Sequence, residues 1–436
     1  MSMKPSIGWL LGLGWLLSAC ASPDVDDRFA ASERFSIAVI PDTQNYIDYR
    51  HQRAEGFVLD GQAMFMQQMR DISGRPDIAF VASVGDVWQH STLPVDPEHA
   101  ARGVGAIDNP YFGAALAPDD RTFQVEIPGA IQGYRLLKDA AIPFGVAPGN
   151  HDYDAFWSAA GYPPRLGQDG AALDPAELDR AALEMGVIHI GGLDNFRSVF
   201  GDQGEFFKNQ SWYVDSYRGG ANSAQIFAAG GYQFLHITLE MSADDSVLRW
   251  AGDVIRDHPH YPTIITTHDY LNSKGERLAN PILDLAAVDP EHHNNAEQIW
   301  GKLISAWDQV FMVLSGHHHG QAYRVDRNHY GNPVYQLMAD YQGRGQAGLD
   351  AGADRVTGLG DGWYRLMQFD FSTATPTLQV QTWSSHYRSN AGKLSTYADW
   401  YRDYEQPGMN ATEFVAADEF EISLAGFRER FSQYAN

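Results

Sequence analysis

Residues 35–44 read FSIAVIPDTQ: six mostly apolar residues, then Pro41, and then Asp42, Thr43 and Gln44. A short apolar run that ends at a proline predicts a buried strand. The polar residues begin where this strand ends, and strand ends are where α/β proteins place ligands and catalytic groups. The stretch therefore predicts a functional carboxylate at the end of a buried strand.

Four later segments repeat this arrangement, because an apolar run at each is followed by side chains that can bind a metal. They are Gly85-Asp86 after 78–84, Gly149-Asn150-His151-Asp152 after 142–147, Thr267-His268 after 263–267, and Gly316-His317-His318-His319 after 310–314. Mixed oxygen and nitrogen donors suit Mn²⁺, Fe or Zn²⁺ rather than a metal that prefers thiolates. Two such ions, about 4 Å apart, can clamp a phosphoryl group during in-line displacement.

The segments between these motifs predict an α/β core, since strands alternate with apolar residues at helical spacing. The expected helices lie near 63–69, 131–141, 247–255 and 299–307, and a further buried strand is expected at 233–239. The later pattern predicts hairpins, which pair 321–325 with 333–338 and 363–371 with 377–383, and a last strand at 419–424. Stretches near 90–129 and 153–230 lack a clear period, and we interpret them as long insertions over the site.

The ordered motifs resemble those of the calcineurin-like metallophosphoesterase family, whose pattern is D-x-H, G-D, G-N-H-D/E, H and G-H-x-H. The resemblance covers roughly residues 35–371 and depends on all five motifs in order, because each alone is weak. It implies a four-layer α/β/β/α sandwich of two mixed sheets. It also implies a metal-dependent hydrolase of phosphomonoesters or phosphodiesters, in which hydroxide held by a dinuclear metal centre attacks phosphorus.

The resemblance assigns a role to each site residue and implies two divalent ions, with Mn²⁺ favoured and Fe or Zn²⁺ as alternatives. The implied ligands are Asp42 and His319 for the first metal, Asp86 as the bridge, and Asn150, His268 and His317 for the second. His151 would stabilise the developing charge and protonate the leaving oxygen. Asp152 would fix the ring of His151, as carboxylates that orient a histidine do.

Several positions depart from related patterns. Gln44 stands where the family has histidine, so it would either ligate weakly through its amide oxygen or hydrogen-bond to a metal-bound water. Gln89 replaces the tyrosine of purple acid phosphatases, and residues 85–90 lack the arginine of protein Ser/Thr phosphatases, so both subclasses are disfavoured. Arg344 is a candidate for gripping phosphate, whereas His90 and His318 are interpreted as a loop residue and a structural residue.

The N-terminus predicts a lipoprotein signal peptide at residues 1–19. Lys4 is the one charge before an apolar core at 7–17, and LSAC ends at Cys20, the only cysteine of the chain. This apolar run is too short to span a membrane, and LSAC resembles the bacterial lipoprotein box, which implies that Cys20 is acylated. A plain signal peptide with an incidental cysteine is the alternative.

These features predict a lipid-anchored protein of the bacterial cell envelope, in the outer membrane or at the periplasmic face. The expected organisation is a polar tether at 20–34, a metallophosphoesterase domain at 35–390 and a C-terminal extension at 391–436. The 44% hydrophobic content indicates a globular chain, and the net charge of −24 without any basic run disfavours a nucleic-acid surface. The alternative function is a non-catalytic envelope binding protein that retains the fold, and no protein partner is predicted.

Overall fold

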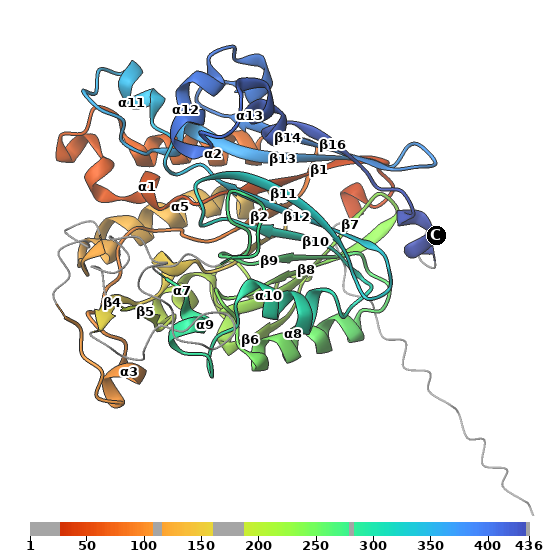
Figure 1. Ribbon diagram of the computed structural model, residues 1–436, viewed down its shortest axis with the longest axis horizontal. Helices are drawn as coiled ribbons and strands as arrows, with labels where there is room; N and C mark the ends of the chain where they lie inside the picture. Colours follow the sequence, from red (N-terminus) through yellow and green to blue (C-terminus); the bar gives the residue numbers. More distant parts are fainter. Residues whose placement is uncertain (1–26, 108–115, 160–186, 279–282, 433–436) are drawn as a thin grey trace, which may run out of the picture.

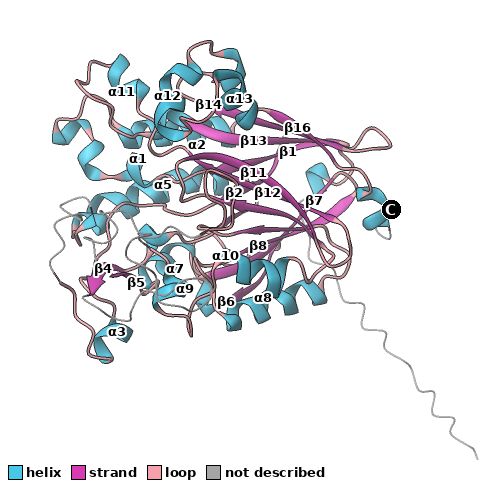
Figure 2. Ribbon diagram, viewed as in Figure 1, coloured by secondary structure: helices cyan, strands magenta, loops and turns pink. Residues whose placement is uncertain are grey.

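Two mixed seven-stranded sheets lie face to face, with helices on their outer sides, in the computed structural model (Figures 1 and 2). The structure describes residues 27–107, 116–159, 187–278 and 283–432. The two sheets and their outer helices confirm the predicted α/β/β/α sandwich. The signal peptide, Cys20 and the first part of the tether lie outside the described residues.

The first sheet is built around the strand that the opening stretch predicts. β1 (Arg34–Ile40) runs parallel to β2 (Ile78–Ser83), which runs parallel to β3 (Phe144–Val146). On its other side β1 pairs antiparallel with β13 (Trp363–Asp370). The sheet continues through β14 (Thr377–Ser384) to β15 (Ser389–Asn390) and β16 (Phe420–Ser423).

The second sheet supplies the remaining predicted strands. Its parallel centre consists of β8 (Tyr232–Thr238), β9 (Thr263–Thr266), β10 (Val310–Ser315) and β12 (Pro333–Asp340). β11 (Gly320–Arg327) forms the predicted hairpin with β12 at one edge. β6 (Tyr213–Tyr217) and β7 (Asn222–Ala229) complete the other edge, so the last part of the stretch interpreted as an insertion belongs to the sheet.

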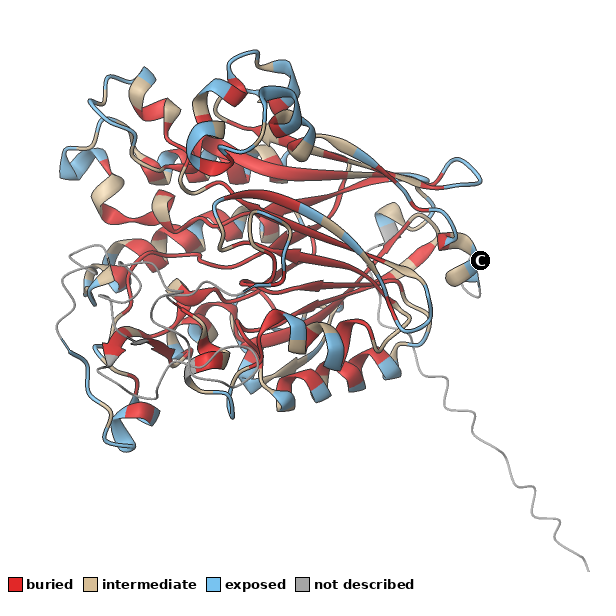
Figure 3. Ribbon diagram, in the orientation of Figure 1, coloured by how far each residue is buried: buried red, intermediate tan, exposed pale blue. Residues whose placement is uncertain are grey.

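Aromatic side chains fill the space between the sheets, where burial is most continuous (Figure 3). Phe35 of β1 stacks on Phe369 of its own sheet at 4.9 Å between ring centroids and meets Phe234 of the second sheet at 5.7 Å. Because successive side chains of a strand point to opposite faces, the neighbouring residues of β1 face the outer helices instead. Continuous burial on both faces explains why the strands read as unbroken apolar runs.

Helices cover the outer face of each sheet. α2 (Gly61–Ser73) and α5 (Ile127–Asp139) pack on the first sheet, and α8 (Asp245–Asp257) packs on the second. The helix expected at 299–307 is α10 (Ala296–Ile299), which continues into a π-helical turn over Trp300–Ile304. It begins earlier than predicted because the Asn295 side chain accepts a hydrogen bond from the Gln298 amide and caps the first turn.

The C-terminal residues are integral to the sandwich. β16 joins the first sheet, while α12 (Tyr397–Glu405) and α13 (Ala411–Asp418) lie above it in Figure 1. The small sheet of β4 (Ala155–Ala159) and β5 (Val187–Gly191) stands apart from the two large ones. Six further α-helices of the described residues are short: α1 (Gln44–Ile47), α3 (Pro97–Ala101), α7 (Asp194–Phe200), α9 (Leu285–Val288), α11 (Gln346–Asp350) and α14 (Phe427–Arg430). Within the described residues, none of the helices has the length and apolar character needed to cross a bilayer.

Candidate metal centre

Loops from the two sheets meet where their parallel strands end, and these loops carry the predicted ligands. The His268 ring, after β9, donates from Nδ1 to the carbonyl of Val84, which follows β2, at 2.8 Å. The His317 amide, after β10, donates to Asp42 Oδ2, after β1, at 3.1 Å. The strands thus bring together residues that lie up to 275 positions apart in the chain.

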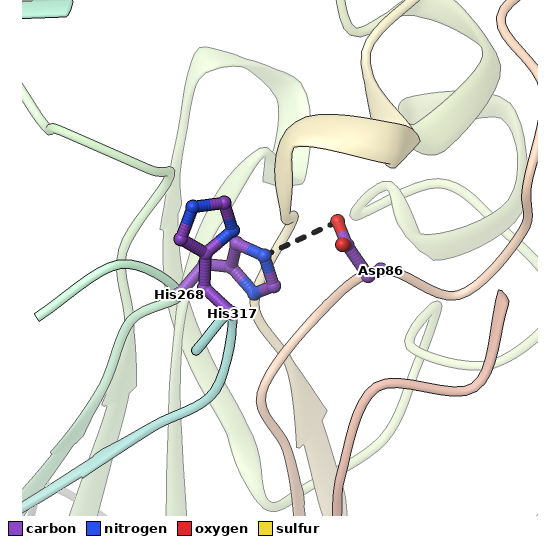
Figure 4. Close-up of side chains that lie close together, drawn as sticks. All are labelled: Asp86, His268 and His317. Atoms are coloured by element: carbon purple, nitrogen blue, oxygen red, sulfur yellow. Dashed lines mark ion pairs between the residues drawn. The ribbon is translucent and has the colours of Figure 1, made fainter. Parts of the chain in front are cut away.

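Asp86, His268 and His317 form the centre of the site (Figure 4). One ligand atom from each lies within 4.8 Å of the others, and Nε2 of His268 is 3.3 Å from Asp86 Oδ1. Asn150 approaches the same ring, with its Oδ1 3.2 Å from His268 Nε2. Four of the residues predicted as ligands therefore converge, and Asp42 Oδ2 lies 3.9 Å from His268 Nε2.

Glycines in the motifs allow this close approach. A Cβ on Gly149 would collide with Asp86 Oδ1, and one on Gly316 would collide with Asp42 Oδ1. The ligands Asp86 and His317 themselves have positive φ angles of 51° and 70°. Non-glycine residues adopt this backbone region at a cost, and such strain concentrates at functional sites.

Electrostatics of the site are dominated by carboxylates that burial places close together. Burial and the nearby charge of Asp340 raise the pKa of Asp42 well above its ordinary value. Although burial alone lowers the pKa of His268, the carboxylates of Asp86 and Asp42 raise it to about 10. Asp340 ends β12, beside the ligand strand β10, and it is fully buried. Sequence reasoning passed over Asp340, although its place at the end of a strand was a usable signal.

Two predicted ligands have buried polar atoms without a hydrogen-bond partner among the described residues, namely Gln44 Oε1 and His317 Nε2. The amide nitrogen of Gln44 donates to Asp86 Oδ2 at 3.1 Å and to Gln342 Oε1. Its oxygen is therefore the atom left over, which is the atom that a metal would take. Both are atom types that can ligate a divalent cation, so the residues present fit one at this position.

His151 lies at the rim of the site, half-buried, and its backbone amide donates to Asp86 Oδ1 at 2.9 Å. Its Nδ1 is 2.6 Å from the carbonyl oxygen of Gln89. Asp152 does not hold this ring, contrary to the expectation. Its carboxylate instead accepts from the amides of Gly149 and Val87, each at 2.8 Å, and so ties two ligand loops together. Burial and the charge of Asp86 raise the pKa of Asp152 to about 7.

His319 is the predicted ligand that the structure does not bring into the central group. It is exposed, and it is not a member of the group formed by Asp86, His268 and His317. Its ring lies beside Gly343, where a Cβ would come within 3.0 Å of Nδ1. Its assignment as a ligand of the first metal stays a prediction.

Three other residues considered from the sequence have structural partners. Arg344 is fully buried and pairs with Glu405 at 2.7 Å, so it is not available to grip phosphate. His90 lies in a loop, as expected, but it is buried, and it pairs with Glu126 at 2.6 Å. His318 pairs with Asp269 at 2.9 Å, and these two residues form with His317 a second group whose ligand atoms lie within 4.8 Å of one another.

A cavity of about 370 Å³ is lined in part by Tyr153, the residue after Asp152. None of the predicted ligands lines it. Its guanidinium groups face nearby carboxylates, as where Arg218 pairs with Asp244 at 2.5 Å. This balance of charge gives it no preference for a phosphate group.

Comparison with known proteins adds little to this geometry. No family model matches the chain. It is 26% identical over 235 residues to the uncharacterized protein YvnB of Bacillus subtilis (strain 168), an alignment that covers 51% of this chain but 16% of YvnB. Among solved structures, the calcineurin-like phosphoesterase YfkN from Bacillus subtilis is similar at 11% identity and a TM-score of 0.29, over 88% of this chain and 98% of that chain. Neither similarity bears on activity.

The architecture and the positions of the donor side chains agree with the family resemblance of the sequence. The chain has the two mixed sheets and outer helices that its resemblance to calcineurin-like metallophosphoesterases predicted. Carboxylate, amide and imidazole donors meet at the strand ends in the predicted order along the chain.

Proposed function

We propose that this protein is a metal-dependent hydrolase of phosphate esters with a dinuclear centre at the ends of β1, β2, β9 and β10. The observation that carries the proposal is the convergence of three buried carboxylates, those of Asp42, Asp86 and Asp340, on one region. Buried carboxylates that repel one another need bound cations or protons to remain there.

The residues present fit divalent cations. Gln44 Oε1 and His317 Nε2 are buried and have no hydrogen-bond partner among the described residues. An imidazole nitrogen suits Mn²⁺, Fe or Zn²⁺, and an amide oxygen is a weaker ligand for the same ions. Asp86 can serve as the bridge, because it lies between Gln44 on one side and His268 on the other. Asn150, His268 and His317 would hold one metal, and Asp42 and His319 would hold the other.

Bound metal ions would supply an activated water and neutralise negative charge on the phosphoryl oxygens. The protein's own contribution is orientation and proton transfer. The Gln89 carbonyl accepts from His151 Nδ1, so Nε2 is the nitrogen that can face a substrate and give a proton to the leaving oxygen. Asp152 holds the loops that carry Asp86 and Asn150 at a fixed separation.

The test is hydrolysis of p-nitrophenyl phosphate and bis-p-nitrophenyl phosphate by purified protein loaded with Mn²⁺. We expect turnover of one or both, with two metals bound per chain. Absence of hydrolysis with Mn²⁺, Fe and Zn²⁺ alike would contradict the proposal. The ratio of the two rates also decides between a monoesterase and a diesterase.

A non-catalytic envelope binding protein is the second candidate, and metal content separates it from the enzyme. Fewer than one metal per chain after Mn²⁺ loading would favour the binding protein. The ligand atoms left unpartnered favour the enzyme, because a protein that only binds a partner has no use for them.

The envelope location is a further part of the proposal and is supported by the leader sequence and Cys20. Expression of the full chain with and without Cys20→Ser tests it. We expect wild-type protein in the membrane fraction and the variant in the soluble fraction. Equal distribution of the two would contradict lipid anchoring.

A further inference from the structure

We propose that Glu126 is a positioning residue that sets the orientation of His151 through the backbone of residues 89–90. This inference rests on the proposed function, because it concerns the group expected to protonate the leaving oxygen. Glu126 lies at the end of the stretch interpreted as an insertion, and it precedes α5 directly. No motif of the sequence includes it.

The first step is the contact between His151 and Gln89. The distance of 2.6 Å from Nδ1 to the carbonyl oxygen is that of a short hydrogen bond, and a carbonyl can only accept. The proton is therefore on Nδ1, and the ring is held with Nε2 outward. Since a backbone oxygen does this, the orientation of the ring depends on where the peptide between residues 89 and 90 lies.

The second step is the anchoring of that peptide by Glu126, a fully buried carboxylate. Its Oε2 accepts from the amides of Gln89 at 3.2 Å and His90 at 3.0 Å. Its Oε1 faces His90 Nδ1 at 2.6 Å and the amide of Tyr49 at 3.4 Å. Charge-assisted hydrogen bonds of this kind are about twice as strong as neutral ones. One carboxylate therefore holds the backbone amides of residues 89 and 90 in place.

The third step is support from the same turn. Thr122 starts the π-helical turn that ends at Glu126, and its hydroxyl donates to the carbonyl of His90 at 3.1 Å. On the other side the ring of His90 stacks on Tyr49, with 5.2 Å between centroids. The segment after the ligand Asp86 is thus held by two side chains of one turn.

A metal site is the rival explanation, because Asp48, His90 and Glu126 offer three ligand atoms within 4.8 Å. The hydrogen bonds argue against it. Both oxygens of Asp48 already accept from Arg50 Nε, at 2.9 and 3.0 Å, and both oxygens of Glu126 accept from the groups named above. A group whose donors and acceptors are matched needs no cation.

The test compares Glu126→Ala and wild type on p-nitrophenyl and phenyl esters, in the mono- or diester series that the wild type hydrolyses faster. A p-nitrophenolate leaves without a proton, whereas phenolate needs one. We expect kcat to fall by about tenfold or more for the phenyl ester but by less than about threefold for the p-nitrophenyl ester. KM and bound Mn²⁺ should be unchanged, and the variant should add no further loss to His151→Ala.

Two variants serve as controls. Glu126→Gln keeps one oxygen for the amides of residues 89–90, so we expect it to restore most of the rate on the phenyl ester, and it carries the test if Glu126→Ala does not fold. Asp96→Asn removes another buried carboxylate of the same stretch, one that caps α3 and pairs with His99. It should keep the wild-type ratio of the two rates.

Equal losses on both esters, loss of Mn²⁺, or losses that add to those of His151→Ala would overturn the inference. The failure of the proposed function is distinct, because wild-type protein would then hydrolyse neither ester. In that event, selective isotope labelling of histidine still decides the structural claim. If Glu126 sets the ring, Glu126→Ala shifts the Nδ1–H signal of His151, and an unchanged signal refutes the claim.

Discussion

Two clusters of buried polar side chains differ in how their charges are balanced. The ligand cluster consists of Asp42, Asp86, His268 and His317. The Arg344 cluster consists of Arg344, Arg365, Glu405 and Asp418. In the Arg344 cluster two guanidinium groups meet two carboxylates, with Arg344 2.7 Å from Glu405 and Arg365 3.1 Å from Asp418.

In the ligand cluster the carboxylates face one another and Asp340, and no guanidinium among the described residues pairs with them. Burial and Asp340 raise the pKa of Asp42, which means that ionising it costs free energy in the metal-free protein. The Arg344 cluster therefore balances its own charge and holds the fold together, whereas the ligand cluster sets the carboxylates of Asp42, Asp86 and Asp340 against the imidazole of His268, an arrangement that fits bound cations. The same distinction explains why Arg344, which the sequence offered as a phosphate ligand, is structural.

The largest effect is expected from Asp86→Asn. Because Asp86 contacts Gln44 and His268 and would bridge the metals, we expect a loss of bound Mn²⁺ and at least about a 10³-fold fall in kcat/KM. Metal analysis and the rate on the preferred nitrophenyl ester measure both. Retention of activity without Asp86 would show that the ligand cluster is not the active site.

Arg344→Met should affect stability rather than chemistry. It leaves the buried Glu405 without its guanidinium partner and takes one of two such partners from Asp418, which costs about 3–5 kcal/mol in the free energy of unfolding. Arg34→Met removes an exposed pair with Asp370, and it should cost less than about 1 kcal/mol. Denaturant unfolding measures both. A selective loss of Mn²⁺ in Arg344→Met at full stability would refute the distinction.

His236 is a buried histidine outside the ligand cluster, and hydrogen bonds satisfy both nitrogens of its ring. Both of its ring nitrogens have partners at 2.8 Å, Gln225 and Thr266, and burial lowers its pKa to about 3. The unfolded chain binds a proton near the ordinary value of 6.5, so folding stability is fully present above that pH and falls as pH drops towards 3.

Within that window His236 contributes a slope of up to about 1.4 kcal/mol per pH unit. His236→Gln removes the proton-binding group, so its stability should fall less steeply between pH 6 and 4 than that of the wild type, on the order of one proton less. Urea unfolding at several pH values gives both slopes. Parallel slopes would show that His236 is already charged in the folded protein.

Metal binding should stabilise the protein through the ligand cluster alone. At a free Mn²⁺ concentration of about 100 times Kd, the free energy of unfolding should rise by about 2.7 kcal/mol. The rise should persist in Arg344→Met and vanish in Asp86→Asn. A rise that survives in Asp86→Asn would place the cation elsewhere.

The smallest effect is expected from Gln44→His. An imidazole is a better ligand than an amide oxygen, so the weaker metal should bind about tenfold more tightly, equivalent to about 1.4 kcal/mol. Titration with Mn²⁺ measures the change. Unchanged affinity would mean that Gln44 acts only as a hydrogen-bond donor to Asp86.

Much of the fold could be predicted from local patterns of apolar residues in the sequence. Unbroken apolar runs predicted β1, β2, β9 and β10, because strands covered on both faces have no polar side to show. The predictions failed where long-range pairing decides. β6 and β7 alternate weakly, and they become strands because β7 pairs with β8 and β6 pairs in turn with β7.

The sequence by itself determined which residues could bind a metal, because each ligand type directly follows a strand. Only the tertiary structure decided how they are used. It placed Asp340 beside Asp42 and left His319 exposed. It also bonded the Asp152 carboxylate to the ligand loops and the His151 ring to a backbone carbonyl. The reason is physical: a strand end specifies which side chains are available, whereas charge balance and hydrogen-bond partners come from segments far apart in the chain.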